Sequence, residues 1–80
     1  MKKRIDQFGP MLRQLRLTKE LTQEELSERV NVHSGYISRL ESGQKYPNLD
    51  MVFKLADALE VRPGTMLDAV EERLGHSENR

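Results

Sequence analysis

The sequence predicts an all-α fold, a compact domain of five short helices. Apolar residues recur at helical spacings of three and four along most of the chain, and no run alternates long enough to indicate a strand. The length of 80 residues allows one domain with one modest core. We assign the helical domain to residues 7–74, a basic N-terminal arm to residues 1–6 and a flexible C-terminal tail to residues 75–80.

The first predicted helix covers about residues 7–17. Phe8, Leu12 and Leu15 lie at positions i, i+4 and i+7, which form one apolar face. Pro10 has no N–H to donate, so it is expected in the first turn, where an N–H has no partner within the helix.

The second predicted helix begins at the sequence TQEE and ends near residue 30. Thr22 can accept a hydrogen bond from the N–H of Glu25, and the Glu25 carboxylate can reach back to the N–H of Thr22, so the two residues form a capping box. Leu21 and Leu26 are placed as a hydrophobic staple. Asn31 follows the helix and tolerates a left-handed conformation better than most residues, although less well than glycine.

The third predicted helix covers residues 34–42, and only three residues separate it from the second. Gly43 ends it, and Pro47 prevents an early continuation. Two helices joined by so short a turn and crossing steeply form a helix-turn-helix. The fourth and fifth helices are predicted over about residues 49–60 and 63–73, with apolar stripes made by Val52, Leu55, Ala56 and Leu59, and by Met66, Leu67, Val70 and Leu74.

The outer side of the third predicted helix has an unusual composition. At 100° per residue, Ile37 and Leu40 mark the buried side. The alternative is an ordinary solvent-exposed face. Such a face usually carries good helix formers, however, and serine and glycine lower helix propensity. A helix that enters a major groove about 12 Å wide needs slim side chains on its leading side. We therefore expect DNA to face the opposite arc, which consists of Ser34, Gly35, Ser38, Arg39 and Ser42.

The formal net charge is zero, but the charges are unevenly distributed. Residues 1–20 carry six basic and two acidic side chains, residues 21–48 carry three and four, and residues 49–80 carry four and seven. Such a distribution can present a basic face to phosphates. A basic tail at one end and a solvated acidic tail at the other explain the distribution equally well.

Several classes of protein are disfavoured by what the sequence lacks. It has no cysteine, no phosphate-binding glycine-rich loop and no HExxH motif, and its two histidines are far apart. We expect no enzyme activity, no metal site and no cofactor. No apolar run is long enough to cross a bilayer, and the start MKKRIDQFGP lacks the apolar stretch of a signal peptide, so we expect a cytoplasmic protein without a membrane partner.

The segment LTQEELSERVNVHSGYISRLESG (residues 21–43), followed by Pro47 and LADALEV (residues 55–61), resembles the Cro/C1-type, or XRE, helix-turn-helix family of phage and bacterial repressors. The resemblance covers residues 8–67. It implies a lambda-repressor-like bundle of five helices in which the second and third form the DNA-binding motif. It also implies a sequence-specific transcription regulator, a repressor in preference to an activator.

The resemblance implies that Ser34, Gly35 and Arg39 read bases, with Ser38 beside them. The Arg39 guanidinium fits guanine O6 and N7, and such a pair discriminates by about 1–3 kcal/mol. The alternative is an arginine paired with an acid on the protein surface. DNA-backbone contacts are expected at six positions: Arg16, Gln23, His33, Tyr36, Lys45 and Tyr46.

Two of these positions have further expected roles. Gln23 opens the second helix, whose N-terminus favours anions. Arg16 and Glu41 match a basic–acidic pair that ties the first helix to the end of the third.

The sequence departs from the family pattern at four positions. Ser27 replaces the usual alanine; it is expected to let the second and third helices approach closely, and a plain surface serine is the alternative. Asn31 replaces glycine in the turn. His33 stands where serine or threonine usually caps the third helix, so the cap passes to Ser34 or is missing. Gly35 removes a side chain from a base-reading position, so recognition must rest more on its neighbours and on DNA shape.

Similar repressors usually dimerise, and we expect a homodimer that reads two half-sites of a palindromic operator on double-stranded DNA. The expected interface residues are Phe53, Met66 and Val70; the alternative for Phe53 is that it completes the core. A protein partner is the main competing role, because similar small proteins serve as antitoxins that hold a toxin or as restriction–modification controllers. The operator sequence, the regulated genes and any inducer do not follow from the sequence.

Overall fold

The chain folds into a bundle of short helices, described by a computed structural model that covers residues 4–75. A 3-10 helix, η1, runs directly into the first α-helix, and no strand occurs within these residues. The elements in chain order are η1 (Arg4–Gln7), α1 (Phe8–Thr18), α2 (Gln23–Val30), α3 (Ser34–Ser42), α4 (Leu49–Ala58) and α5 (Pro63–Arg73). The predicted all-α fold with five helices is confirmed.

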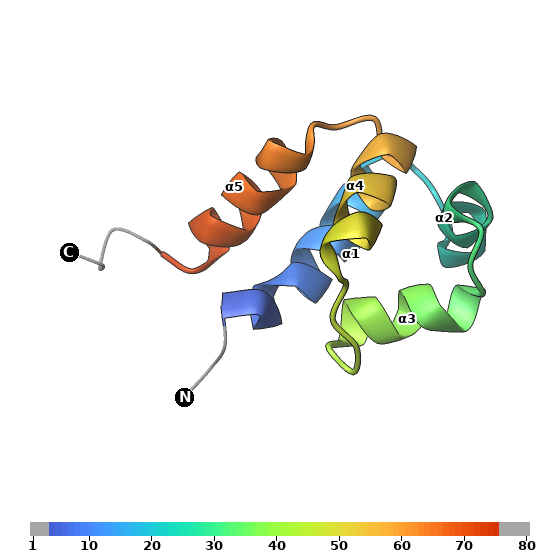
Figure 1. Cartoon of the computed structure of the whole chain (residues 1–80), viewed down its shortest axis with the longest axis horizontal. Helices are drawn as coiled ribbons and strands as arrows, with labels where there is room; N and C mark the ends of the chain where they lie inside the picture. The colour runs from blue at the N-terminus through green and yellow to red at the C-terminus, as the bar shows by residue number, and fades with distance from the viewer. Residues whose placement is uncertain (1–3, 76–80) are drawn as a thin grey trace.

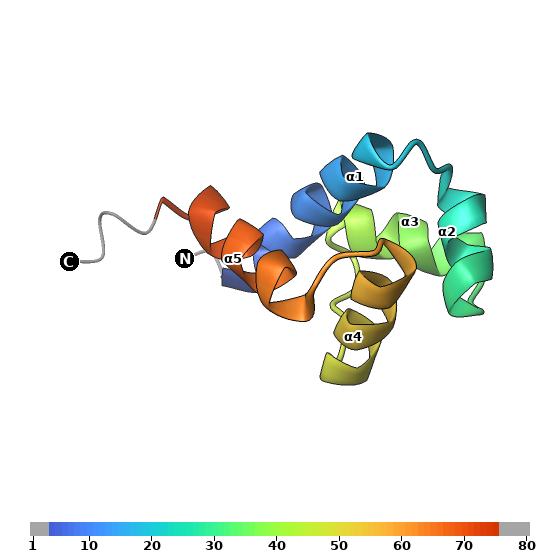
Figure 2. The ribbon, with the colours of Figure 1, turned by 90° about the horizontal axis from the view of Figure 1, so that it is seen from above.

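Helix α1 lies at the centre of the arrangement (Figures 1 and 2). It packs against α3 on one side and against α5 on the other, while α2 packs against α3 and α4. This arrangement leaves α2 and α3 together at one end of the molecule, and α5 at the other end beside the start of the chain (Figure 1).

The two main differences from the predicted helix boundaries have local causes. Helix α4 ends at Ala58 and not at residue 60, because Glu60 adopts a left-handed conformation (φ 59°) and the N–H of Val61 turns back to the carbonyl of Ala56. Residues 4–6, predicted as part of an arm, belong to η1; 3-10 turns are frequent at the start of α-helices. The rest of the predicted arm (1–3) and of the predicted tail (76–80) lies outside the described residues.

The core is aliphatic with one phenylalanine. Each α-helix contributes, and the largest side chains exposed by less than 2% are Phe8, Leu12, Leu26, Ile37, Leu40, Leu55, Leu59 and Met66. Burial of such side chains supplies the main stabilisation of a domain of this size.

Two of the three residues expected at a dimer interface belong to this core. Met66 is fully buried and Val70 is 8% exposed, because both face α1 and α4 from the inner side of α5. Their assignment to a dimer interface was wrong, because their side chains are already buried within one subunit. Phe53 is 53% exposed, so it does not complete the core.

Candidate nucleic-acid interface

A tight turn joins α2 to α3. Asn31 adopts the left-handed conformation (φ 61°, ψ 48°), and the N–H of Val32 donates to the carbonyl of Ser27 over 3.0 Å. Ser27 is 3% exposed, and its hydroxyl donates to the carbonyl of Glu24. The side chain at position 27 is therefore buried, so the alternative of a plain surface serine is wrong.

The start of α2 is capped as predicted. The N–H of Glu25 donates to Thr22 Oγ1 over 3.0 Å, and the N–H of Thr22 donates to Glu25 Oε1 over 2.8 Å. Leu21 and Leu26 are both buried beneath this cap. The capping box fixes the helix end at which Gln23 is expected to meet a phosphate.

The start of α3 has no such cap. His33 occupies the N-cap position in an extended conformation (φ −74°, ψ 148°), but its side chain makes no capping hydrogen bond. Its imidazole is exposed. The N-terminal amides of α3 are therefore not covered by a side-chain oxygen, as the absence of the usual serine or threonine implied. Tyr36, in the first turn of α3, is half-buried against the core.

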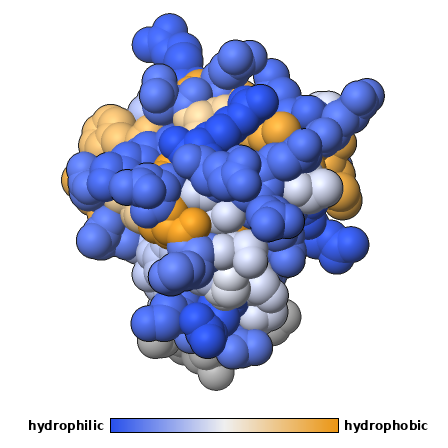
Figure 3. All heavy atoms as spheres, turned by 90° about the vertical axis from the view of Figure 1, so that its right-hand side faces the viewer, coloured by the Kyte–Doolittle hydropathy of each residue, from blue (hydrophilic) through white to orange (hydrophobic). Residues whose placement is uncertain are grey.

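The predicted base-reading residues share the exposed side of α3. Ile37 and Leu40 face inward with at most 1% exposure. Figure 3 shows the side of the molecule that carries α2 and α3, where hydrophilic side chains surround paler atoms of near-neutral hydropathy. The four residues assigned to base reading are all exposed: Ser34, Gly35, Ser38 and Arg39.

Some arginine side chains have partners within the protein, whereas the guanidinium groups of Arg39, Arg13 and Arg62 have no hydrogen bond or ion pair to another described residue. Arg29 donates to the carbonyl of Ala58 and Arg73 to Gln14 Oε1, at 3.0 and 2.8 Å. Within residues 4–75, no hydrogen bond or ion pair engages the Arg39 guanidinium. The alternative of a surface acid as its partner therefore has no support among the described residues.

Arg16 connects α1 to α3 and is buried. Its Nε lies 2.6 Å from Glu41 Oε2, its Nη2 3.0 Å from Glu41 Oε1, and its Nη1 donates to the carbonyl of Leu21. The expected pairing of Arg16 with Glu41 is thus formed. Because Arg16 is only 7% exposed, it has little surface for the phosphate contact that was also expected, and the structure gives no support to that contact.

Gln23 joins the same cluster. Its Nε2 donates to Glu41 Oε1 over 3.0 Å, so one carboxylate receives donors from α1 and from α2 while it belongs to α3. The three helices that form and support the exposed surface are held together at this point. The backbone N–H groups at the start of α2 remain the candidates for a phosphate contact.

Gly9 contributes to the same junction, and the sequence analysis missed it. A Cβ at this position would lie 2.4 Å from the carbonyl oxygen of Glu41 and 2.6 Å from that of Leu40. The backbone of α1 therefore touches the C-terminal end of α3 directly. The only available signal was a glycine inside a helical pattern, which indicates either a turn or a close approach.

The loop after α3 is tied to the helix it follows. The N–H groups of Gln44 and Lys45 both donate to the carbonyl of Arg39, over 2.9 and 3.2 Å. Lys45 is exposed. Tyr46 is 42% exposed, and its hydroxyl donates to Asp6 Oδ1 over 2.6 Å. This hydrogen bond raises the pKa of the Tyr46 phenol, because it favours the protonated form beside a carboxylate.

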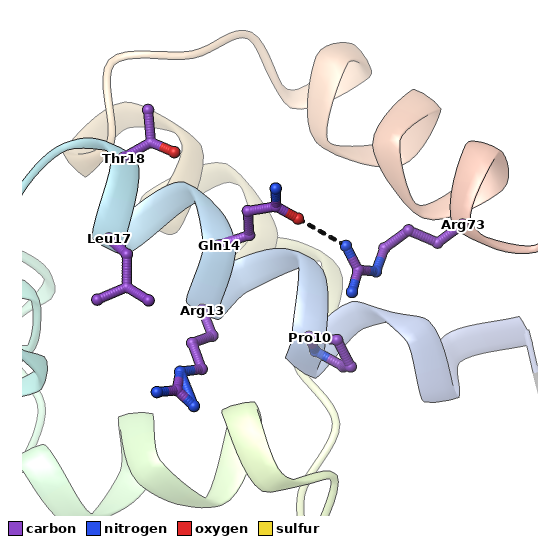
Figure 4. Close-up of a pocket in the computed structure, with 6 residues that line it drawn as sticks. All are labelled: Pro10, Arg13, Gln14, Leu17, Thr18 and Arg73. Carbon is purple, nitrogen blue, oxygen red and sulfur yellow. Dashed lines mark hydrogen bonds between the residues drawn. The ribbon is translucent and has the colours of Figure 1, made fainter.

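A concavity lies elsewhere, between α1 and α5 (Figure 4). Arg73 of α5 reaches across it to Gln14 of α1. It contains none of the residues predicted to contact DNA. Within residues 4–75 there is no cluster of three side chains suited to a metal ion, and no helix of that range has both the length and the apolar composition of a membrane span.

The chain is similar to known helix-turn-helix regulators and controller proteins. A helix-turn-helix family model matches residues 12–66. The chain is 40% identical over 62 residues to the control protein C.BamHI of Bacillus amyloliquefaciens, which covers 76% of both chains. It is 37% identical over 75 residues to the HTH-type transcriptional activator BcrR of Enterococcus faecalis, which covers 92% of this chain but only 37% of BcrR. The crystal structure of the restriction-modification controller protein C.AhdI from Aeromonas hydrophila superposes with a TM-score of 0.74 at 35% identity, over 78% of this chain and 94% of C.AhdI.

Proposed function

This chain belongs to the helix-turn-helix family and is a DNA-binding transcription regulator, and we propose that it acts as a homodimer that inserts α3 of each subunit into the major groove of a palindromic operator. The observation that carries the proposal is the exposed side of α3, where slim residues flank an arginine that no other described residue engages. A guanidinium in that state can bind guanine without first breaking a contact within the protein.

The residues proposed to face the bases are Ser34, Gly35, Ser38 and Arg39. Phosphate contacts are proposed for the N-terminus of α2 at Gln23, for His33 and Tyr36 at the start of α3, and for Lys45 and Tyr46 in the following loop. These segments are held to α3 by the Glu41 cluster and by the backbone bonds to the Arg39 carbonyl. Backbone contacts of this kind set the position of a recognition helix, and base contacts set the sequence that it selects.

A homodimer is supported by the apolar surface of α4 and α5. Leu49 and Phe53 lie one turn apart on α4 and are 66% and 53% exposed, and Leu67 on α5 is 50% exposed. A contiguous exposed apolar patch marks an interaction surface, and we propose that these side chains form one. We propose that these three residues, and not Met66 and Val70, form the contact between subunits. To read two half-sites one turn of DNA apart, the dimer must hold its two copies of α3 about 34 Å apart.

A more specific role is proposed from two of the comparisons. C.BamHI and C.AhdI are named as control proteins, and each has more than three quarters of its length covered by this chain. We propose that the chain is a cytoplasmic controller of a restriction–modification system. A nuclease gene and a methylase gene beside its own gene would support this role; a toxin gene in that place would indicate an antitoxin.

The test of the proposed function is selection of duplexes from a randomised pool, followed by affinity measurements at several salt concentrations. A palindromic winner, with an affinity that falls steeply as salt rises, is the expected result. Failure to enrich any sequence, with only weak binding at low salt, would contradict the proposal and favour a role in which the fold holds a protein partner.

A further inference from the structure

Gly35 lies one helical turn before Arg39, in the first turn of α3. A Cβ built on Gly35 would meet one neighbour within 4 Å among the described residues outside the helix's own backbone, the Nη1 atom of Arg39 at 3.9 Å. The guanidinium of Arg39 is therefore beside the bare backbone of Gly35. This follows the general direction of long side chains in α-helices, which point back toward the N-terminus.

The backbone itself does not require glycine at position 35. The glycines with a positive φ among the described residues are Gly43 and Gly75, whereas Gly35 has ordinary helical geometry. Glycine in a helix costs about 1 kcal/mol relative to alanine, so this residue lowers the stability of a helix that has no side-chain cap. What the glycine provides is open space on the surface proposed to face DNA.

The direction of the Arg39 side chain matters for recognition. Helices of this motif contact base edges mainly with their N-terminal residues. Arg39 belongs to the second turn, but its guanidinium reaches the level of Gly35, four residues or about 6 Å nearer the helix start. A larger side chain at position 35 would occupy this place and turn the guanidinium away.

We propose that Gly35 is a specificity-determining residue: the space that it leaves open lets Arg39 lie along α3 and read the base pair that a side chain at position 35 would otherwise face. This inference rests on the proposed function and adds that Gly35 controls the position of the Arg39 side chain. Position 35 then acts through Arg39 and makes no hydrogen bond of its own to a base.

The experiment compares base preferences of the wild type, Gly35→Leu, Gly35→Ala and Arg39→Ala on the operator selected by the wild type. Gly35→Ala tests how much space the side chain of Arg39 needs, because a Cβ at 3.9 Å from Nη1 makes only an ordinary van der Waals contact. Wild type and Gly35→Ala should prefer guanine at one position of each half-site by roughly tenfold or more. Gly35→Leu should lose the preference for guanine as completely as Arg39→Ala does. The double variant Gly35→Leu/Arg39→Ala should show no greater loss of that preference than either single variant.

Retention of the Arg39-dependent guanine preference in Gly35→Leu, or its loss in Gly35→Ala, would overturn the proposal while leaving the proposed function intact. Absence of any selected operator for the wild type would overturn both. Far-UV circular dichroism establishes that each variant is folded. Should Gly35→Leu fail to fold, Gly35→Gln replaces it with the same expected loss of the guanine preference.

Discussion

Arg16 of α1 and Glu41 of α3 form a two-point contact, in which Nε lies 2.6 Å from Oε2 and Nη2 lies 3.0 Å from Oε1. Their side chains are only 8% and 4% exposed. Hydrogen bonding to Glu41 raises the pKa of Arg16, so the guanidinium stays charged inside the protein. Since Gln23 also donates to this carboxylate, one acidic side chain fixes three helices behind the exposed surface.

The first prediction concerns Glu41→Gln. Loss of the carboxylate charge leaves the buried guanidinium without its ionic partner, which should lower the free energy of unfolding by about 3 kcal/mol. Urea denaturation measures this change. The control is Lys54→Ala, which removes an exposed pair with Asp50 (3.4 Å, side chains 55% and 75% exposed) and should change stability by less than about 0.5 kcal/mol. Equally small effects for both variants would contradict the structural role of the buried pair.

The second prediction concerns Gly9→Ala. The new Cβ would lie 2.4 Å from the carbonyl oxygen of Glu41, so α1 and α3 must separate, at a cost of about 1–3 kcal/mol in unfolding free energy. Gly64→Ala in α5 is the matched control, because nothing lies within 4 Å of a Cβ there. The thermal midpoint should fall for Gly9→Ala and stay level or rise for Gly64→Ala. A stabilised Gly9→Ala variant would show that the helices do not touch in this way.

The third prediction concerns Phe53→Glu. If α4 and α5 form the contact between subunits, this change should yield folded monomers in sedimentation experiments, because a carboxylate would be buried in an apolar interface. Leu17→Glu changes an equally exposed apolar residue on α1 and should leave the dimer intact. A dimer that survives Phe53→Glu but dissociates with Leu17→Glu would move the interface to α1.

The fourth prediction concerns pH. The hydrogen bond to Asp6 raises the pKa of Tyr46 above its ordinary value of 10.0, and the Asp6 charge adds to the effect. The contact therefore stabilises the fold below pH 10 and is lost as pH rises through the raised pKa. Ultraviolet titration of the phenol in a Tyr36→Phe background isolates Tyr46. Adding Asp6→Asn should shift its titration to lower pH; an unchanged titration would show that the two side chains do not interact.

Much of the fold could be predicted from local signals. The bounds of α3 and α5 follow from Gly43, which adopts a positive φ of 84°, and from Pro63 in the first turn. The capping box at Thr22 and the left-handed Asn31 were also predictable, because each depends on neighbours in the sequence.

The remaining features depend on contacts between distant segments. Periodicity places Met66 and Val70 on an apolar stripe, but it does not tell whether that stripe meets the core or a second subunit. The contact of Gly9 with α3 and the hydrogen bond between Asp6 and Tyr46 join residues more than 30 positions apart. The position of the Arg39 guanidinium beside Gly35 depends on a side-chain rotamer, which sequence spacing only suggests.

The central claim is that α3 reads DNA through Arg39, and one measurement tests it most directly. Affinities of the wild type, Arg39→Ala and Lys45→Ala are compared on the selected operator and on its single-base-pair variants. Arg39→Ala should lose discrimination at one base pair per half-site, about 1–3 kcal/mol, whereas Lys45→Ala should weaken binding to all sequences equally and reduce the salt dependence. Uniform weakening by Arg39→Ala, with every base preference retained, would contradict the claim and make Arg39 a phosphate contact.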